Sequence, residues 1–448
     1  MTPSSQPIDG KARPTVGRAS RTRRAPTRQR LIGAATEVAA TCGYANLSVA
    51  QVIESAGVSR STFYEHFVDL EECFLAALDG LAIDLIERLE EIEPADPPSV
   101  GPLIEALCEF VGGDPAAARV LFMESLAAGA KAMDARERLQ HQIAALIAVT
   151  SQTDSDNDQA VSAVLENLVG GLFRLFAMRL RRNLVDVASE LSPVDLAAWV
   201  DSYTAVMTEP DREPAAKLLL RNAQPTETYE LKTLPAGRHG LTEAEVGMNR
   251  RVRVYTALAS LSHEAGYAHT SVSGITADAR ISRNAFYRLF HNKAEAATKG
   301  LELMLEQVIG ACASAFTSGS SWPDQVWRAS EAFASFFATA RDYCYLGLVE
   351  THVVGDEMTQ LIYDRIGAFA LFLEGGYRWR PQAQKLPRVS SEAIGATMYE
   401  IAFRALRERR RSEWYMESLP QFIFICLVPF MGHEAATNFV AARSEVDR

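Results

Sequence analysis

The chain has 448 residues, of which 48% are hydrophobic and 23% are charged; this is the balance of an ordinary soluble protein with length for two to four domains. Its six cysteines include no Cys-x-x-Cys pair, and the sequence has no Gly-rich phosphate loop, His-Glu-x-x-His or Gly-x-Ser-x-Gly motif, so we expect no metal, no other cofactor and no enzyme. The longest apolar run, residues 422–431, is far shorter than the roughly 20 residues of a bilayer span, and the N-terminus has no apolar stretch, which predicts a cytoplasmic protein without a membrane segment.

The net charge of -11 is unevenly distributed. Residues 1–30 carry a net charge of +7, and the remainder carries -18. A basic segment on an acidic body is expected of a protein that touches phosphate with one surface, although basic disordered tails also occur without that role. We predict a basic, disordered arm over residues 1–26.

Three helices are predicted after this arm. Apolar residues from Leu31 to Ala39 fall at helical spacing, and Gly43 is placed to end the first helix in a left-handed turn. Ser48 and Ser59 are placed to cap two short helices, with Gly57 at the tight turn between them. Two short helices joined in this way form a helix-turn-helix unit.

The third helix has a buried and an exposed face. Phe63 and Phe67 are four residues apart and are expected to point inward. Arg60, Ser61 and Tyr64 then lie on the outer part of the helix. Such short polar and basic side chains suit base edges and phosphates in a DNA major groove.

The chain also repeats itself. Residues 43–72 align without a gap with residues 266–295 at an offset of 223, and twelve of the thirty positions are identical. The second copy departs at the turn, where Arg280 replaces Gly57; a residue other than glycine held at positive φ costs on the order of 1 kcal/mol. Weaker similarity continues downstream, so the repeat spans whole domains.

Residues 56–67, AGVSRSTFYEHF, resemble the helix-turn-helix signature of the TetR family, and residues 279–290, ARISRNAFYRLF, are similar with more departures. The resemblance implies an all-α fold of two tandem TetR-like halves. In each half a three-helix DNA-binding domain is followed by a helical effector-binding and dimerisation domain. The expected domains are the basic disordered arm (1–26), the first DNA-binding domain (27–74), the first regulatory domain (75–208), a linker (209–246), the second DNA-binding domain (247–297) and the second regulatory domain (298–448).

The resemblance also implies double-stranded DNA as a partner. Carrying the family's DNA contacts over by position gives Ser48, Arg60, Ser61, Thr62, Tyr64 and His66 in the first unit, and Ser271, Arg283, Asn284, Tyr287 and Lys293 in the second. Ala285 and Leu289 stand where the first unit has Thr62 and His66. We therefore expect the two units to read different half-sites or to bind with unequal strength.

The regulatory halves are apolar, and spacing alone does not separate a ligand pocket from a packed core. Eight aromatic residues of the second half could line a pocket, although core packing is favoured for most of them: Phe316, Trp322, Trp327, Phe333, Phe336, Phe337, Tyr343 and Tyr345. Glu124 and Glu350 occupy matching places beside apolar runs. Because a buried, unpaired carboxylate is costly, we expect each to face solvent or to be paired, with a polar pocket as the other possibility.

By resemblance, the last two helices of each half form a four-helix interface between subunits. With two copies in one chain, this predicts either an intramolecular pseudo-dimer or a homodimer. The resemblance implies a transcriptional regulator, usually a repressor, that an unknown small apolar effector releases from DNA. The alternative is an interaction or scaffold protein in which one or both units no longer bind DNA; the polar and basic residues on the third helix of both copies argue against it.

Overall fold

A computed structural model of the chain describes residues 17–93, 95–152, 159–181, 192–207 and 243–446, and over these residues it is all-α, without a strand. The first half contains α1 (Gly17–Cys42), α2 (Val49–Ala56), α3 (Arg60–His66), α4 (Leu70–Glu90), α5 (Gly101–Gly113), α6 (Pro115–Phe122), α7 (Ala130–Thr150), α8 (Gln159–Arg181) and α10 (Pro193–Met207). Short 3-10 turns, η1 (Tyr44–Asn46) and η2 (Glu124–Leu126), join α1 to α2 and α6 to α7.

The second half repeats the order of the first three helices. It begins with α12 (Glu243–Ala265), η3 (Tyr267–His269), α13 (Val272–Asp278) and α14 (Arg283–Leu289). The helices of its regulatory part are α15 (Lys293–Thr317), α16 (Trp322–Thr339), α17 (Arg341–Leu348), α18 (Thr351–Val354), α19 (Asp356–Ala370), α20 (Val389–Arg407), α21 (Glu413–Glu417), α22 (Leu419–Met431) and α23 (His433–Val446), with the turns η4 (Leu371–Arg378) and η5 (Ala383–Lys385).

Two predicted boundaries are shifted by helix extension. The arm is expected to be disordered to residue 26, but α1 already begins at Gly17; the linker is expected to run to residue 246, but α12 begins at Glu243. Arginine, alanine and glutamate are good helix formers, so both helices continue outward beyond their apolar faces. The rest of the arm, residues 1–16, and of the linker, residues 208–242, lies outside the described residues.

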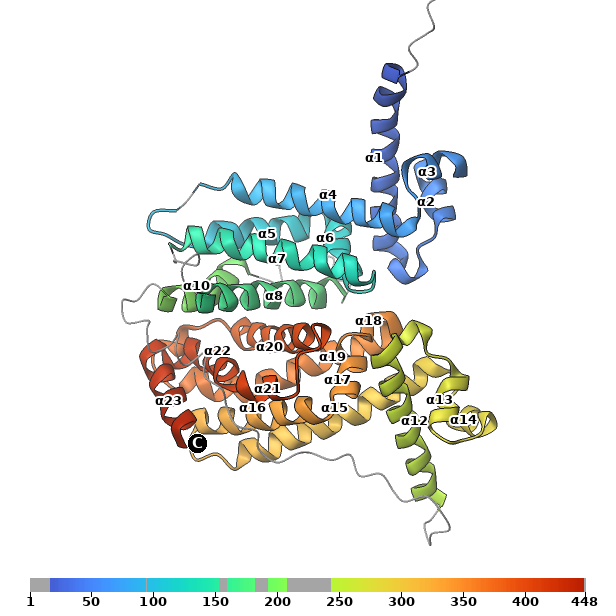
Figure 1. The fold of residues 1–448 in the computed structure, drawn as a ribbon. Helices are drawn as coiled ribbons and strands as arrows, with labels where there is room; N and C mark the ends of the chain where they lie inside the picture. Colours follow the sequence, from blue (N-terminus) through green and yellow to red (C-terminus); the bar gives the residue numbers. More distant parts are fainter. Residues whose placement is uncertain (1–16, 94, 153–158, 182–191, 208–242, 447–448) are drawn as a thin grey trace, which may run out of the picture.

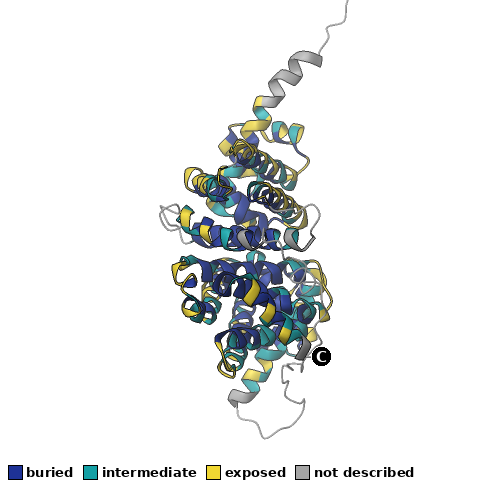
Figure 2. Cartoon of the chain, turned by 90° about the vertical axis from the view of Figure 1, so that its left-hand side faces the viewer, coloured by how far each residue is buried: buried dark blue, intermediate teal, exposed yellow. Residues whose placement is uncertain are grey.

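The two halves pack against each other through α8 and α10 of the first half and α20 and α22 of the second. The sequence predicts the last two helices of each half here, but the last helix of the second half, α23, packs on α22. Helix α8 of the first half lies along α20 of the second half, and α10 packs against α20 and α22 (Figure 1). Buried residues line both sides of this contact (Figure 2). In this structure the four-helix interface thus forms within one chain.

One stretch, Glu413–Met431, has the length and composition of a membrane-crossing helix. However, 83% of it is buried inside the protein. Its apolar side chains, including those of Phe422, Ile423 and Leu427, are buried, and α22 packs against α10 of the first half as well as against helices of the second half. It is therefore a packing element of the core, as the sequence predicts.

The two helix-turn-helix units, α1–α3 and α12–α14, project from the same side of the molecule at its two ends (Figure 1). Each unit is anchored through its first helix, since α1 packs against α4 and α6, and α12 packs against α15 and α17.

Candidate nucleic-acid interface

The turn of the first helix-turn-helix is held by two serine caps and one glycine. Ser48 Oγ accepts a hydrogen bond from the backbone N–H of Gln51, and Ser59 Oγ accepts one from Thr62. Gly57 lies between the two helices with φ 60° and ψ 43°, the left-handed conformation in which glycine has no steric penalty. These roles are the ones predicted from the sequence.

An arginine from the first helix braces each turn, a feature that the sequence analysis missed. Arg30 Nη2 donates hydrogen bonds to the carbonyl oxygens of Ala56 and Gly57. At the equivalent place in the second unit, Arg253 Nη2 donates to the carbonyl oxygen of Arg280 (2.7 Å). The two arginines are 223 positions apart, which is the offset of the internal repeat. Extending the alignment upstream of Gly43 would have found them.

Helix α3 presents its predicted contact residues outward. Phe63 is fully buried, whereas Tyr64 is 48% exposed and Arg60 and Ser61 are exposed. The guanidinium of Arg60 lies 5.8 Å from the centre of the Tyr64 ring. A cation and an aromatic hydroxyl thus stand together on a short helix, where they can reach a DNA backbone or base edge.

The other predicted residues of the first unit are less accessible. Thr62 and His66 are half-buried, and Thr62 Oγ1 lies 2.8 Å from Ser59 Oγ. Ser48 is also half-buried, and its hydroxyl donates to Gln51 Oε1 (2.6 Å). The hydroxyls of Ser48 and Thr62 are thus engaged at the N-terminal ends of α2 and α3.

The second unit reproduces this face. Arg283 and Asn284 are exposed, Tyr287 is 51% exposed, and Phe286 is fully buried. Ser271 is exposed and caps α13 by accepting from the N–H of Gly274 (3.1 Å). Exposed polar groups therefore recur at the same positions of α3 and α14.

Lys293 differs from the other ten predicted contacts. Its Nζ donates to the carbonyl oxygens of Tyr267 (2.8 Å) and Thr270 (3.0 Å) and lies 4.2 Å from the centre of the Tyr267 ring. Burial lowers the pKa of its ammonium, and the nearby carboxylate of Glu350 opposes this shift. Two of its three donor hydrogens are thus engaged inside the unit.

A buried glutamate connects each helix-turn-helix to the helical region that follows it. Glu124 is 8% exposed; its Oε2 accepts from the N–H of Tyr44 (2.8 Å), and its Oε1 lies 3.9 Å from Arg119 Nη2. Glu350 is 9% exposed and accepts a hydrogen bond from the N–H of Tyr267. Of the alternatives from the sequence, the paired arrangement is found, not the solvent-facing one.

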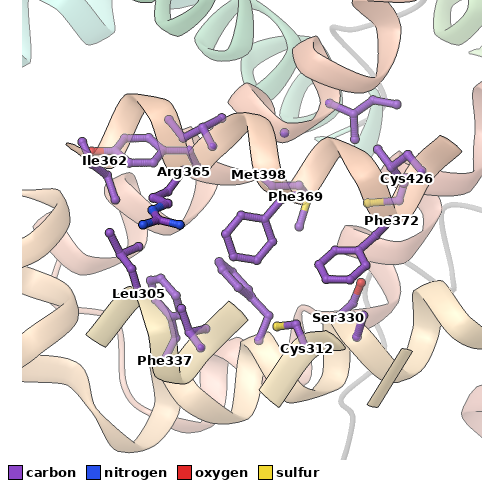
Figure 3. A pocket seen from close by; sticks show the side chains of 18 of the residues that line it. Leu305, Cys312, Ser330, Phe337, Ile362, Arg365, Phe369, Phe372, Met398 and Cys426 are labelled. Carbon is purple, nitrogen blue, oxygen red and sulfur yellow. The ribbon is translucent and has the colours of Figure 1, made fainter. Parts of the chain in front are cut away.

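The second half encloses an apolar cavity of about 100 Å³ between α15, α16, α19 and α20 (Figure 3). Phe333 and Phe337 line it together with Phe369, Phe372 and Met398, and Figure 3 shows the side chain of Arg365 at one end. Of the other six aromatic residues singled out from the sequence, Trp322, Trp327 and Phe336 are buried outside the cavity lining, and the remaining three, Phe316, Tyr343 and Tyr345, are half-buried and pack against the core.

Among the described residues, no group of three or more His, Cys, Asp or Glu side chains is arranged to hold a metal ion. Exposed polar side chains recur at matching positions of the two short helices α3 and α14. Residues 31–77 match the family model of the bacterial regulatory proteins of the tetR family, so the first unit is similar to the helix-turn-helix domain of those regulators.

Proposed function

We propose that this protein is a sequence-specific, double-stranded DNA-binding transcriptional regulator in which both units of one chain read one operator. The observation that carries the proposal is the recurrence of an exposed Arg and Tyr on each third helix, Arg60 with Tyr64 and Arg283 with Tyr287. Both helices lie on the same side of one body (Figure 1). Recognition helices on one face of a protein can enter successive major grooves of DNA when they are about 34 Å apart.

The two recognition helices, α3 and α14, present different side chains to the bases. Thr62 and His66 of the first unit are replaced by Ala285 and Leu289, which are buried and half-buried. Asn284 of the second unit can pair with adenine in two hydrogen bonds, whereas Ser61 at the same position has one hydroxyl. The proposed operator therefore has two unlike half-sites.

The proposal includes repression that a small apolar effector relieves, with the second-half cavity as the effector site. Helix α15 supports this coupling because it begins at Lys293, which contacts the turn before α13, and passes Met304 and Cys312 in the cavity wall. A ligand in the cavity that displaces α15 would move α14, the recognition helix of the second unit. A change in the spacing between the two recognition helices weakens binding to an operator of fixed geometry.

Selection of binding sites from random duplex DNA tests the proposal. The full chain is compared with two double variants, R60A/Y64A and R283A/Y287A. We expect two unlike half-sites about one helical turn apart, each lost with its own pair of substitutions. Enrichment lost only with the first pair would leave the second unit as a structural partner.

The competing function is that of an interaction protein whose units no longer bind DNA. It predicts no enriched sequence even at low salt, where phosphate contacts are strongest. A control pair away from the recognition helices, K299A/E302A on the exposed face of α15, should leave the selected sequence unchanged. Loss of selection in this control as well would indicate damage to the fold.

A further inference from the structure

The contact between the halves has an approximate two-fold axis. Residues that pack against the equivalent residue of the other half show where this axis lies. Counterparts in α8 and α20 are 226 positions apart, an offset that relates Arg181 to Arg407. It also relates Gly171 to Thr397, and these two residues pack against each other, since a Cβ at Gly171 would overlap Thr397 Oγ1. The axis therefore passes between them.

Away from the axis, ion pairs cross the contact in both directions. Arg179 of the first half donates to both oxygens of Glu392 (2.7 and 2.6 Å). Arg404 of the second half lies 3.4 Å from Glu166. Because each half supplies both signs of charge here, these pairs do not distinguish an unlike partner from a second copy.

At the axis the charges are segregated. Arg174 corresponds to Glu400, and Arg174 Nη2 lies 2.9 Å from Glu400 Oε2, while Arg136 Nη1 lies 2.5 Å from Glu400 Oε1. All three side chains are at most 2% exposed. Both cations come from the first half, and the carboxylate comes from the second. The residue of the second half that corresponds to Arg136 is Ile362.

The ionised state of this cluster depends on the unlike pairing. Burial alone would raise the pKa of Glu400, but the guanidinium groups of Arg136 and Arg174 more than compensate and hold that pKa well below its usual value. A buried charge that loses its partner is strongly destabilising. Two first halves paired across this axis would bury four guanidinium groups with no Glu400, and two second halves would bury two carboxylates with neither arginine.

The shape of the contact makes the same distinction. A Cβ added at Gly170 would lie 2.6 Å from Glu400 Cγ, closer than real Cβ atoms approach a neighbour. The counterpart of Gly170 in the second half is Ala396. A second half paired with its own copy would therefore place the Ala396 methyl against Glu400.

From the charge and the shape together, we infer that this surface of the first half is built to accept the second half and that each half rejects a copy of itself. The partner for each surface is thus the unlike half, identified by its buried charge of opposite sign. This inference rests on the contact between the halves and is independent of DNA binding. It makes the pseudo-dimer within one chain the specified assembly.

Charge reversal in the full chain tests the inference. R174E and E400R each place like charges at the axis, whereas R174E/E400R restores opposite charges. We expect the Tm of each single variant to fall by roughly 5–10 °C, the scale of a broken buried pair, and the double variant to recover at least half of that fall. The double variant remains informative if a single reversal prevents folding.

Mixing the two single variants tests the choice of partner. Glu at position 174 of one chain and Arg at position 400 of the other are complementary, so native mass spectrometry should detect a 1:1 heterodimer that neither variant forms alone. R179E mixed with E400R is the matched control and should give no heterodimer. A double variant no more stable than the single ones, unchanged Tm in both single variants, or no heterodimer in the first mixture would overturn the inference.

Discussion

The carboxylate of Glu124 accepts a hydrogen bond from the backbone N–H of Tyr44, 80 residues earlier in the chain. Tyr44 begins the turn that follows α1, and Glu124 begins the turn that follows α6. Glu350 and Tyr267 repeat the connection in the second half. Each helix-turn-helix unit is thus joined to the helical region that follows it by a polar contact at a chain turn.

Substituting Glu124 separates the value of this hydrogen bond from the cost of its charge. Glu124→Ala leaves the Tyr44 N–H without an acceptor and should lower the free energy of unfolding by about 1–3 kcal/mol. Glu124→Gln keeps an acceptor oxygen and removes a buried charge, so at pH 7 it should be at least as stable as the natural chain. Denaturant unfolding of the three proteins measures both differences.

The difference in stability between the natural chain and the Gln variant should change with pH in one direction. Burial raises the pKa of Glu124 above its ordinary 4.5, and the hydrogen bond from Tyr44 and the charge of Arg119 only partly oppose the shift. A raised pKa means that stability from this group is fully present below pH 4.5 and is lost as pH rises through the folded-state value. The Gln variant should therefore lose its advantage as pH falls from 7 toward 4.5; a constant difference would contradict the assignment.

The helix-turn-helix geometry follows from local sequence, whereas the contact between regions does not. Caps at Ser48 and Ser59, the turn at Gly57 and the buried Phe63 depend on residues within four positions, so their spacing predicts them. Glu124 and Tyr44 meet only after α1 packs on α6. No period in the sequence encodes that distance, which is why burial and pairing of Glu124 remained open alternatives.

The interface shows the same limit. The resemblance to the family predicts that the last two helices of each half form a helical interface, but it does not point to α20, which packs along α8. Arg174 and Glu400, however, look like ordinary helix residues until the two halves are superposed at an offset of 226. Complementary charges across a two-fold axis depend on how the two halves assemble, so the periodicity of a single helix does not predict them.

Relieving strain at the second turn should stabilise the second unit. Arg280 is held at φ 51°, where a side chain with a Cβ is unfavourable. Arg280→Gly keeps the backbone carbonyl that accepts from Arg253, so we expect a gain of about 0.5–1 kcal/mol in protection from hydrogen exchange at α13 and α14. The reverse change at the first turn, Gly57→Ala, should lower protection at α2 and α3.

Filling the cavity should abolish binding of a small apolar probe. Benzene occupies apolar cavities not much larger than this one of about 100 Å³, and a bound ligand at ten times its Kd stabilises the folded state by about 1.4 kcal/mol. We expect benzene to raise the Tm of the natural chain but not of Ala329→Leu, whose side chain lies in the cavity wall. Ala332→Leu, on the same helix and outside the lining, should respond like the natural chain.

Substitution of Lys293 tests whether this residue positions the second helix-turn-helix unit or contacts DNA directly. Its two hydrogen bonds to Tyr267 and Thr270 predict that Lys293→Met destabilises the second unit by about 1–2 kcal/mol. If the ammonium holds the turn and makes no phosphate contact, the slope of log K against log salt for the selected operator stays the same. A slope smaller in magnitude by about 0.9 would instead reveal one lost phosphate contact. Lys299→Met removes an equal charge from an exposed pair with Glu302 on the same helix, and it should change neither stability nor slope. A loss of stability specific to Lys293 therefore reports on the turn, and a change in slope specific to Lys293 reports on a phosphate contact.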